Sequence, residues 1–304
     1  GGKQLRAGPI AAICALAAKK SRRAVKLELD REQDMAFCPG RGPVDATYKA
    51  GFNEEGKILA LEVEFCLSGG SSNDYSADIA ETATLLLDGA YKIENVHLHG
   101  LCLKTNFGSG TATRGFGKPQ ASAIIETVLD HGASVLGLDP TDLRYLNLYK
   151  KGDQTITKMK IQDDVMETCY QRLLEKSHVP QLREEIEAFN KGNKWLKRGL
   201  AITSSKGNMG FVESDDINRG LALVHIQRDG SVSVNHSGIE MGQGINTRMA
   251  QITAACLDIP LMQVASTATQ SALIPNTPPT TMVATDLIGE AIVKACSEIG
   301  RAHV

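Results

Sequence analysis

The sequence predicts an α+β fold with two domains. Its 304 residues exceed the usual size of a single hydrophobic core. Helical and hairpin patterns are mixed along the chain without a regular strand–helix–strand alternation. Hydrophobic residues make up 42% and charged residues 22%, an ordinary balance for a globular protein. The polar stretch 150–162 marks the expected boundary, so we predict domains over 1–150 and 151–304.

In the first domain, the clearest strand signal is a hairpin. Leu61, Val63 and Phe65 alternate with two glutamates, which gives one dry and one wet face. The hairpin strands are expected over 46–52 and 57–66, joined by the turn 53–56. Further strands are expected over 24–29 and 96–104. Helices are expected over 5–20, 78–87 and 119–136, with a short one that starts at Asp139-Pro140.

The second domain shows the same mixture of elements. Residues 163–191 predict two amphipathic helices with charged outer faces. Strands are expected over 200–205, 222–226 and 232–236, with a hairpin turn at 228–231 between the last two. Helices are expected over 244–257 and 285–298. Both domains are therefore predicted as mixed α/β layers with antiparallel hairpins and flanking helices.

Composition argues against several classes of partner. The formal net charge of −2 and an aromatic content of 5% do not favour nucleic acid. The longest apolar run, near Pro9–Ala18, is shorter than the ~20 residues that span a bilayer. Seven cysteines are dispersed without a C-x-x-C pair, which is typical of small buried side chains in a reducing compartment. We expect a cytoplasmic protein in which this stretch binds no iron–sulfur cluster or structural zinc.

The two ends suggest a piece of a longer protein. The chain begins with Gly1-Gly2-Lys3, without a methionine or a signal-peptide pattern. Its last residues, 299–304, back-translate in one frame to a common sequencing adapter, so we expect them to be derived from the adapter. For that reason His303 is assigned no chemistry.

The first glycine-rich motif is Gly108–Gln120, between an expected strand and a long helix. Glycines let a backbone approach a ligand closely, and a helix start offers free N–H groups to an anion. Arg114 adds a planar donor, and Phe116 adds a flat apolar surface. Spacing alone leaves two readings equally open: an anion or cofactor site, and a surface turn with an exposed arginine.

The second motif is Gly238–Gly244, which again follows a strand and opens a helix. It is not G-x-G-x-x-G in a strand–helix–strand unit, so a dinucleotide fingerprint is rejected. The Gln243 amide, between two glycines, suits a heterocycle with donor and acceptor edges. A plain strand-to-helix loop is an equally good interpretation. The third glycine-containing stretch, Gly1-Gly2, leads into the first expected helix. Taken alone, it is better interpreted as an ordinary helix start than as a ligand site.

Together these motifs resemble the molybdenum hydroxylases, the family of xanthine dehydrogenase and aldehyde oxidase. The matching stretches are T-A-x-R-G-F-G-x-P-Q at 111–120 and G-x-E-M-G-Q-G at 238–244. Further similar stretches are 29–35, 41–43, 48–52, 147–153, 275–277 and 285–289. The resemblance covers nearly the whole chain except its last six residues.

The resemblance implies a molybdenum ion held by a pyranopterin dithiolene, with no direct protein ligand. Members insert water-derived oxygen into an electron-poor carbon with help from a glutamate general base. Electrons then pass through two iron–sulfur clusters and FAD to NAD or oxygen. The family's glutamate lies in a motif that would follow Val304, so no catalytic residue is expected here, and Glu290 is only a look-alike. The resemblance also implies a homodimer.

Carried over residue by residue, the resemblance assigns both cofactor and substrate contacts. The expected substrate contacts include Phe116 and Phe211, which would sandwich a flat substrate; a core aromatic is the alternative for Phe211. Residues 280–283 are expected to border the pterin. The expected cofactor contacts are Gly2, Arg114, Gly242, Gln243 and Met282.

Departures from the family pattern bear on the substrate. Xanthine enzymes carry a glutamate where this chain has Gln4, an arginine where it has Thr82, and a threonine where it has Val212. The two missing charged residues would orient a purine and stabilise negative charge on it. Thr113 and Lys118 also differ from the family pattern. A pocket without these charges favours an aldehyde oxidase-like enzyme that hydroxylates aldehydes or N-heterocycles.

Three alternatives stay open. One is a xanthine dehydrogenase paralogue with altered purine specificity. Another is that the isolated chain neither holds the cofactor tightly nor turns over, because the catalytic glutamate lies outside it. The last is a non-catalytic binding module that uses the Arg114 loop to hold a nucleotide or another anion. The charge balance and the lack of a phosphate-loop lysine argue against this module.

Overall fold

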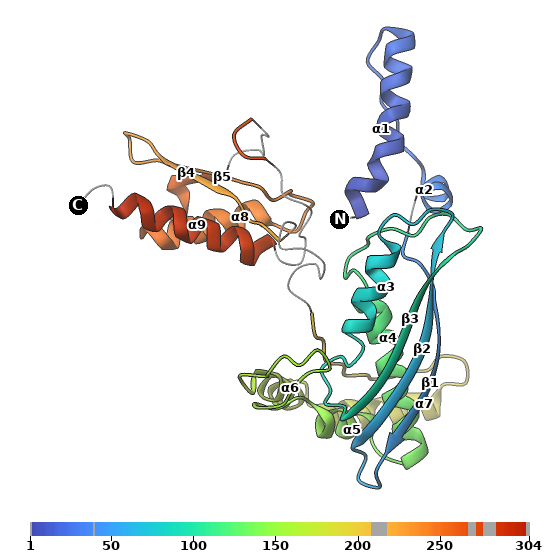
Figure 1. Ribbon diagram of the computed structural model, residues 1–304. Helices are drawn as coiled ribbons and strands as arrows, with labels where there is room; N and C mark the ends of the chain where they lie inside the picture. Colours follow the sequence, from blue (N-terminus) through green and yellow to red (C-terminus); the bar gives the residue numbers. More distant parts are fainter. Residues whose placement is uncertain (1, 39, 208–217, 267–271, 276–283, 302–304) are drawn as a thin grey trace. The chain divides into compact units, whose positions relative to one another are not determined.

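The computed structural model describes residues 2–38, 40–207, 218–266, 272–275 and 284–301. The chain divides into two compact units, one over 28–207 and the other over 1–27 together with 208–304. Within these described residues, each unit contains one three-stranded mixed sheet with helices packed against it (Figure 1). The predicted α+β character is therefore confirmed. The boundary at 150–162 stays a prediction.

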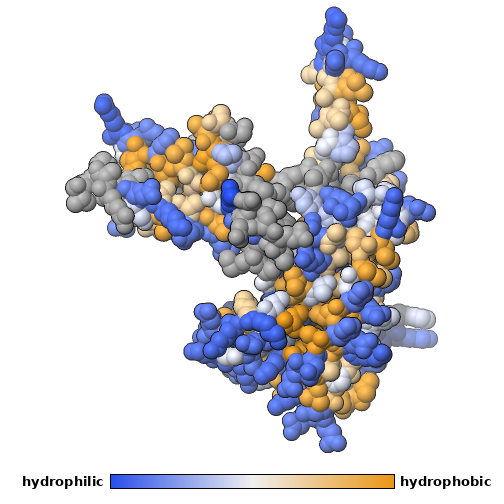
Figure 2. Space-filling model, in the orientation of Figure 1, coloured by the Kyte–Doolittle hydropathy of each residue, from blue (hydrophilic) through white to orange (hydrophobic). Residues whose placement is uncertain are grey.

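Helix α1 (Gly2–Ser21) opens the chain. Its alanines and leucines favour helix, and Lys19 and Lys20 in the last turn complement the negative end of the helix dipole. Ile13 and Leu16 on this helix are 59% and 56% exposed. Figure 2 shows the hydropathy of the described surface. Within the described ranges, no helix has the length and apolarity that crossing a membrane requires.

The sheet of the larger unit is built from β1 (Val44–Phe52), β2 (Ile58–Gly70) and β3 (Asn95–Lys104). β1 and β2 form the expected antiparallel hairpin, and the alternation of Leu61, Val63 and Phe65 places all three at 2% exposure or less. β3 pairs with β2 in parallel, through a crossover that contains α3 (Ser76–Leu85). Sequence alternation does not record pairing direction, so this parallel pair was not predicted.

Two helices cover one face of this sheet. α3 packs against β2 and β3, and α4 (Lys118–Leu136) packs against β1 and α3 (Figure 1). The fit against α3 is tight at Gly100, where an added Cβ would lie 2.5 Å from both Phe65 Cζ and Thr84 Oγ1. A side chain at this point of β3 would push the helix off the sheet.

The rest of this unit is helical, with α5 (Pro140–Asn147), α6 (Val165–Lys176) and α7 (Val179–Gly192). Asp139 caps α5 by accepting a 2.7 Å hydrogen bond from the Thr141 N–H, and it pairs with Arg183 on α7. Burial tends to raise the pKa of Asp139, but hydrogen bonds from Arg183 and Thr141 hold it below its usual range. The cap thus also joins α5 to α7.

The second sheet repeats the connectivity of the first. β4 (Ala222–Ile226) and β5 (Val232–His236) form an antiparallel hairpin, and β5 pairs in parallel with β6 (Val264–Ser266) across α8 (Ile245–Leu257). The 3-10 turn Leu261–Gln263 precedes β6, and α9 (Ala284–Arg301) ends this unit. Each unit therefore contains a hairpin, a crossover helix and a parallel third strand, with further helical structure after it.

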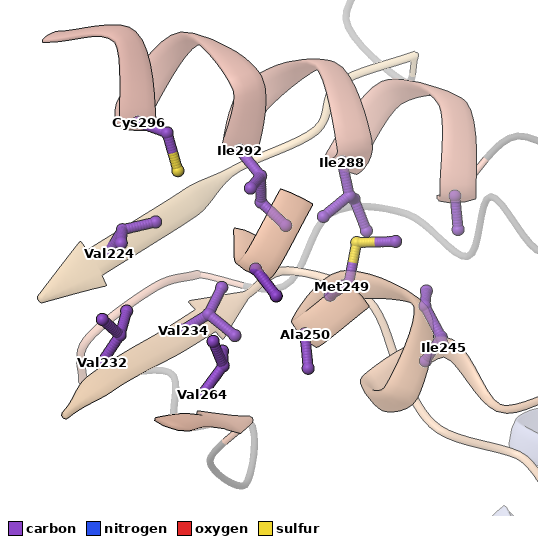
Figure 3. Close-up of a cluster of buried hydrophobic side chains, with 12 residues drawn as sticks. Val224, Val232, Val234, Ile245, Met249, Ala250, Val264, Ile288, Ile292 and Cys296 are labelled. Atoms are coloured by element: carbon purple, nitrogen blue, oxygen red, sulfur yellow. The ribbon is translucent and has the colours of Figure 1, made fainter. Parts of the chain in front are cut away.

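Apolar side chains from the three strands, α8 and α9 meet in one cluster. Figure 3 shows Ile288 and Ile292 of α9 facing Met249 of α8 and Val234 of β5. All four are 0% exposed. The remaining members are Val224, Val232, Ile245, Ala250, Ala254, Val264, Ala284 and Cys296. The spacing of Ile288, Ile292 and Cys296, one helical turn apart, explains why α9 presents a single stripe to the sheet.

His236 ends β5 and is 2% exposed. Its Nδ1 accepts a 3.2 Å hydrogen bond from the Gly238 N–H, and its Nε2 lies 2.9 Å from Asn246 Oδ1 at the start of α8. These partners require a neutral ring with the proton on Nε2. Burial lowers the pKa of His236 below its usual value, and Asn246 offsets only part of that effect.

Two strand predictions were wrong. Residues 24–29 and 200–205 form no strand, since neither segment has a partner strand to pair with. Helix α2 (Arg31–Phe37) was missed, although its capping box of Asp30 and Gln33 is readable in the sequence. The three residues of β6 are too few to show a pattern.

Truncation of the α9 stripe should destabilise the second unit. Ile292→Ala removes a fully buried side chain, so we expect a loss of about 2–5 kcal/mol in the free energy of unfolding. The matched control is Val293→Ala, because Val293 is 40% exposed on the same helix. Urea unfolding of both variants gives the comparison. Equal losses would show that the stripe is not the core.

His236 should make the stability of this unit depend on pH. Because its folded pKa lies below its unfolded value of about 6.5, the unfolded chain binds the proton first as pH falls. The free energy of unfolding should therefore decline as pH drops below about 7. His236→Gln should flatten this decline, whereas His225→Gln, at an exposed position on β4, should retain it. Urea unfolding midpoints measured from above pH 7 to below it test this prediction. The same dependence of the midpoint on pH in His236→Gln and in the unaltered protein would contradict it.

Candidate functional site

Both glycine-rich motifs lie at the carboxyl ends of parallel strands. Residues 108–117 follow β3, which is parallel to β2, and residues 238–244 follow β5, which is parallel to β6. In open sheets with parallel strands, ligands bind in the crevice beyond these strand ends. The topology therefore gives each unit one loop in a position typical of ligand binding.

In the larger unit, the loops after β2 and β3 are pressed together. Gly70 has a φ of +78°, and an added Cβ would lie 2.3 Å from the Gly108 carbonyl oxygen. The Ser72 and Ser109 hydroxyls are 2.7 Å apart, and the Gly110 N–H donates to the Gly69 carbonyl at 2.8 Å. Only glycine permits this close backbone approach.

The Arg114 turn that follows is conformationally demanding. Gly115, Phe116 and Gly117 have φ values of +103°, +40° and +91°. A positive φ is unusual for phenylalanine and marks stored backbone strain. The Arg41 guanidinium donates a 2.7 Å hydrogen bond to the Arg114 carbonyl and so braces the turn. The Arg114 side chain itself is exposed.

Gly117 rests directly on α3. A Cβ at this position would lie 2.5 Å from the Ile79 carbonyl oxygen and 3.0 Å from Thr82 Cβ. Phe116, the preceding residue, is 8% exposed and packs edge-on against Tyr75 with ring centroids 6.0 Å apart. Thr82 is 5% exposed. The structure thus brings two of the predicted substrate contacts, Phe116 and Thr82, to the same place.

Two buried polar atoms flank this turn without a hydrogen-bond partner in the structure. They are Thr111 Oγ1 and Gln120 Oε1, on residues that are 0% and 5% exposed. A buried acceptor without a donor is costly, and such atoms often mark a place where a bound group or water completes the hydrogen bonds. A pterin carries several N–H donors, so the turn suits that class of group.

The second loop, 238–244, is held by its own side chains. The Gln243 Nε2 donates to the Ile239 carbonyl at 2.7 Å, and its Oε1 accepts from the Met241 N–H at 2.5 Å. An amide has two N–H donors and two acceptor lone pairs, so one of each remains for a ligand. Gly242 and Gly244 have φ values of +90° and +77°, which explains the glycines on both sides of Gln243.

Glu240 occupies the start of α8. Its Oε1 accepts hydrogen bonds from the Gly244 and Gly242 N–H groups at 3.0 and 2.7 Å. Together with the Asn246 N–H, these donors hold the pKa of Glu240 below its usual value. The helix start that could bind an external anion is therefore already filled by a carboxylate of this chain.

Arg248 ties this loop to α9. Its Nη2 donates to the Gln243 carbonyl at 2.5 Å, and its Nη1 donates to Thr285 Oγ1 at 2.7 Å. This arginine was not predicted as part of the site. Its place one turn into the helix after the glycine loop is the signal that could have found it.

The remaining predicted residues are placed only in part. Gly2 and Gln4 lie in α1, while Phe211, Val212 and Met282, with the rest of 280–283, fall outside the described residues. The Arg114 turn belongs to one compact unit and the Gln243 loop to the other, so their convergence on one ligand stays a prediction. Among the described residues, no group of three or more histidine, cysteine, aspartate or glutamate side chains is arranged to hold a metal ion.

A buried ion pair in the larger unit was also missed. Lys206 pairs with Asp88, which is 1% exposed and accepts a 2.7 Å hydrogen bond from the Tyr149 hydroxyl. Burial lowers the pKa of Lys206, against the opposing effect of Asp88, and burial with Asp88 raises the pKa of Tyr149. Lys206 directly follows residues 200–205, for which a strand was wrongly predicted.

A groove of about 620 Å³ lies elsewhere in the same unit, beside α5 and α7. Its lining includes Arg183 and Lys191, which pair with Asp139 and Glu187 of the same groove. None of the predicted site residues lines it. Because these lining charges neutralise each other, the groove does not suit a charged ligand.

The chain matches two family models, each described as a molybdopterin cofactor-binding domain, over residues 1–148 and 172–303. It is 42% identical over 300 residues to xanthine dehydrogenase/oxidase of Mus musculus and 40% identical over 300 residues to aldehyde oxidase 2 of Cavia porcellus. In both cases 98% of this chain is covered but only 22% of the relative.

Solved structures agree on the fold. Quinoline 2-oxidoreductase from Pseudomonas putida 86 has a TM-score of 0.75 at 20% identity, covering 94% of this chain and 38% of that protein. Aldehyde oxidoreductase from Desulfovibrio gigas has a TM-score of 0.72 at 22% identity, covering 96% of this chain and 32% of that protein. Two successive molybdopterin cofactor-binding domains, with 40–42% identity to both kinds of relative, place this chain in the molybdenum hydroxylase family of xanthine dehydrogenase and aldehyde oxidase.

Proposed function

We propose that this chain is the molybdopterin-binding part of an aldehyde oxidase-like enzyme that hydroxylates aldehydes or N-heterocycles. The observation that carries this proposal is the position of Thr82. This neutral side chain is 5% exposed and lies against Gly117, next to Phe116. Xanthine enzymes place an arginine here, so the pocket lacks the positive charge that would stabilise an anionic purine.

The residues of the Arg114 turn and the Gln243 loop would hold the cofactor. When bound, the molybdenum cofactor supplies the oxidising centre and the water-derived oxygen. The chain's own contribution is positioning: Gly117 lets the turn rest on α3, and Arg41 fixes the Arg114 carbonyl. The Thr111 and Gln120 oxygens without partners would accept N–H donors, and Gln243 retains one free N–H.

Phe116 would guide a flat substrate. Its ring is 8% exposed and is held edge-on by Tyr75, so it offers a small, rigid apolar surface. The strained backbone of Phe116 between two glycines fixes the ring relative to Thr82. A substrate that needs stacking and no countercharge fits such a surface, and aromatic aldehydes and neutral N-heterocycles have this character.

A purine substrate is the alternative within the same family. It is favoured by the 42% identity to the mouse xanthine dehydrogenase/oxidase, which is close to the identity with aldehyde oxidase 2. Overall similarity therefore does not separate the two substrates. The proposal depends instead on the two uncharged positions, Gln4 and Thr82.

The chain spans 22% of the length of these relatives, so the activity of the whole protein is part of the proposal. In the family, two iron–sulfur clusters and FAD would pass electrons to NAD or oxygen. We propose a cytoplasmic homodimer with that electron path. Because it spans so small a share of these relatives, we expect the 304-residue chain alone neither to retain molybdenum nor to turn over. Metal analysis of the purified chain tests this: stoichiometric molybdenum would contradict it.

Restoring the two charges should restore purine oxidation. In the full-length protein, we expect Gln4→Glu combined with Thr82→Arg to raise kcat/KM for xanthine relative to an aromatic aldehyde by at least about tenfold. Steady-state assays with both substrates measure the ratio. Glu81→Arg is the matched control, since Glu81 is exposed on the same helix and should leave the ratio unchanged.

The unaltered full-length protein provides the decisive comparison. Uric acid formation at a rate similar to aldehyde oxidation would overturn the aldehyde oxidase-like assignment. If the double variant keeps its molybdenum content but shows no gain with xanthine, Thr82 does not line the substrate pocket.

The glycine at 117 should be needed for cofactor loading. Gly117→Ala combines a left-handed φ with a clash against α3, so we expect a loss of about 2–3 kcal/mol in stability and a lower molybdenum content of the full-length enzyme. Gly137→Ala is the control. Its φ of +68° carries similar strain, but nothing lies within 4 Å of the added Cβ. It should cost about 1 kcal/mol and keep the metal. Equal losses of stability and molybdenum in the two variants would show that the contact of Gly117 with α3 is not needed for cofactor loading.

A further inference from the structure

The register of α8 against α9 brings two cysteines together. Arg248 on α8 donates a 2.7 Å hydrogen bond to Thr285 on α9. One turn further on, the Ile252 side chain lies 3.0 Å from the position of a Cβ at Gly289. The helices therefore run side by side with a constant offset. The same offset places Cys256 level with Val293, and Cys296 lies on the next turn of α9.

The two thiols differ in their surroundings. Cys296 continues the buried Ile288–Ile292 stripe and is 5% exposed, with its side chain directed towards the core (Figure 3). Cys256 is exposed. Burial, with a smaller effect of the neighbouring Cys256, raises the pKa of Cys296 to about 11. Cys296 is therefore protected, whereas Cys256 is accessible to reagents in solution.

We propose that Cys256 and Cys296 form a reversible disulfide when the protein meets hydrogen peroxide. This modification site is independent of the molybdenum assignment. It uses a pair of residues from different helices, and both residues are free thiols in this structure.

The reaction proceeds in two balanced steps. The Cys256 thiolate attacks one peroxide oxygen, which breaks the O–O bond, releases hydroxide and leaves a sulfenic acid on Cys256. The Cys296 sulfur then attacks the Cys256 sulfur and displaces the sulfenic oxygen as water. In total, two thiols lose two electrons and two protons, and one hydrogen peroxide becomes two waters. A thiol reductant reverses the change.

The link would join the far ends of α8 and α9. Their near ends carry the Gln243 loop and Thr285, which Arg248 already connects. With the disulfide formed, the helix pair would be held at both ends. The closed loop also restricts the unfolded chain, so the unit should unfold at a higher temperature.

Peptide mapping tests the proposal directly. The purified chain is treated with hydrogen peroxide, alkylated and digested with trypsin. Cleavage after Arg248 and Lys294 places Cys256 and Cys296 in separate peptides. We expect these peptides to be joined with the loss of two hydrogen atoms, and to separate after reduction. The thermal midpoint of the unit should rise by roughly 5 °C or more.

Three variants sharpen the result. Cys256→Ser should abolish the link, and Cys169→Ser, at an exposed cysteine on α6, should leave it intact. Cys296→Ala should leave a sulfenic acid on Cys256 that dimedone can trap. The proposal is overturned if unaltered protein accumulates dimedone-reactive or further oxidised Cys256 without the link. Failure of peroxide to modify Cys256, or a link only between molecules, would overturn it as well.

Discussion

The contact of Gly117 with α3 is the constraint on which the first candidate site depends. It exists because α3 is the crossover between two parallel strands, so that the helix lies beside the loop leaving β3. With no side chain at 117, the backbone settles on Ile79 and Thr82. Phe116, the preceding residue, has a positive φ, and its ring packs against Tyr75. One missing Cβ thus determines which residues surround the turn.

The same connectivity supports a different kind of loop in the second unit. There the glycine-rich motif follows the central strand β5, whereas in the first unit it follows the third strand. The second loop is built mainly from its own polar groups, with Glu240 on the helix start and Gln243 across the turn. A loop held by its own hydrogen bonds keeps its shape without a ligand. Less conformational entropy is then lost when a ligand binds.

Charge is neutralised wherever the larger unit buries it. Arg144 is 2% exposed and pairs with Glu126 at 2.7 Å, and Lys206 pairs with Asp88. A buried charge is tolerated only with such a partner. Around Thr82 and Phe116 the predicted contacts are uncharged, as the proposed neutral, flat substrate would require. The family assignment therefore concerns the cofactor. The neutral residue at position 82 concerns the proposed substrate.

By itself, the sequence determined the two motifs, the family resemblance and most helices and hairpins, because these depend on local spacing and on residue type. The Asp30–Gln33 capping box was readable in the same way. Only the tertiary structure decided that β3 pairs in parallel with β2, that residues 200–205 form no strand, and that Thr82 lies beside Gly117. Local patterns record which face of a segment is apolar, but a partner far along the chain is selected by packing and by hydrogen bonds across the fold. The ion pair of Lys206 with Asp88 and the pairing of Cys256 with Cys296 belong to this second group.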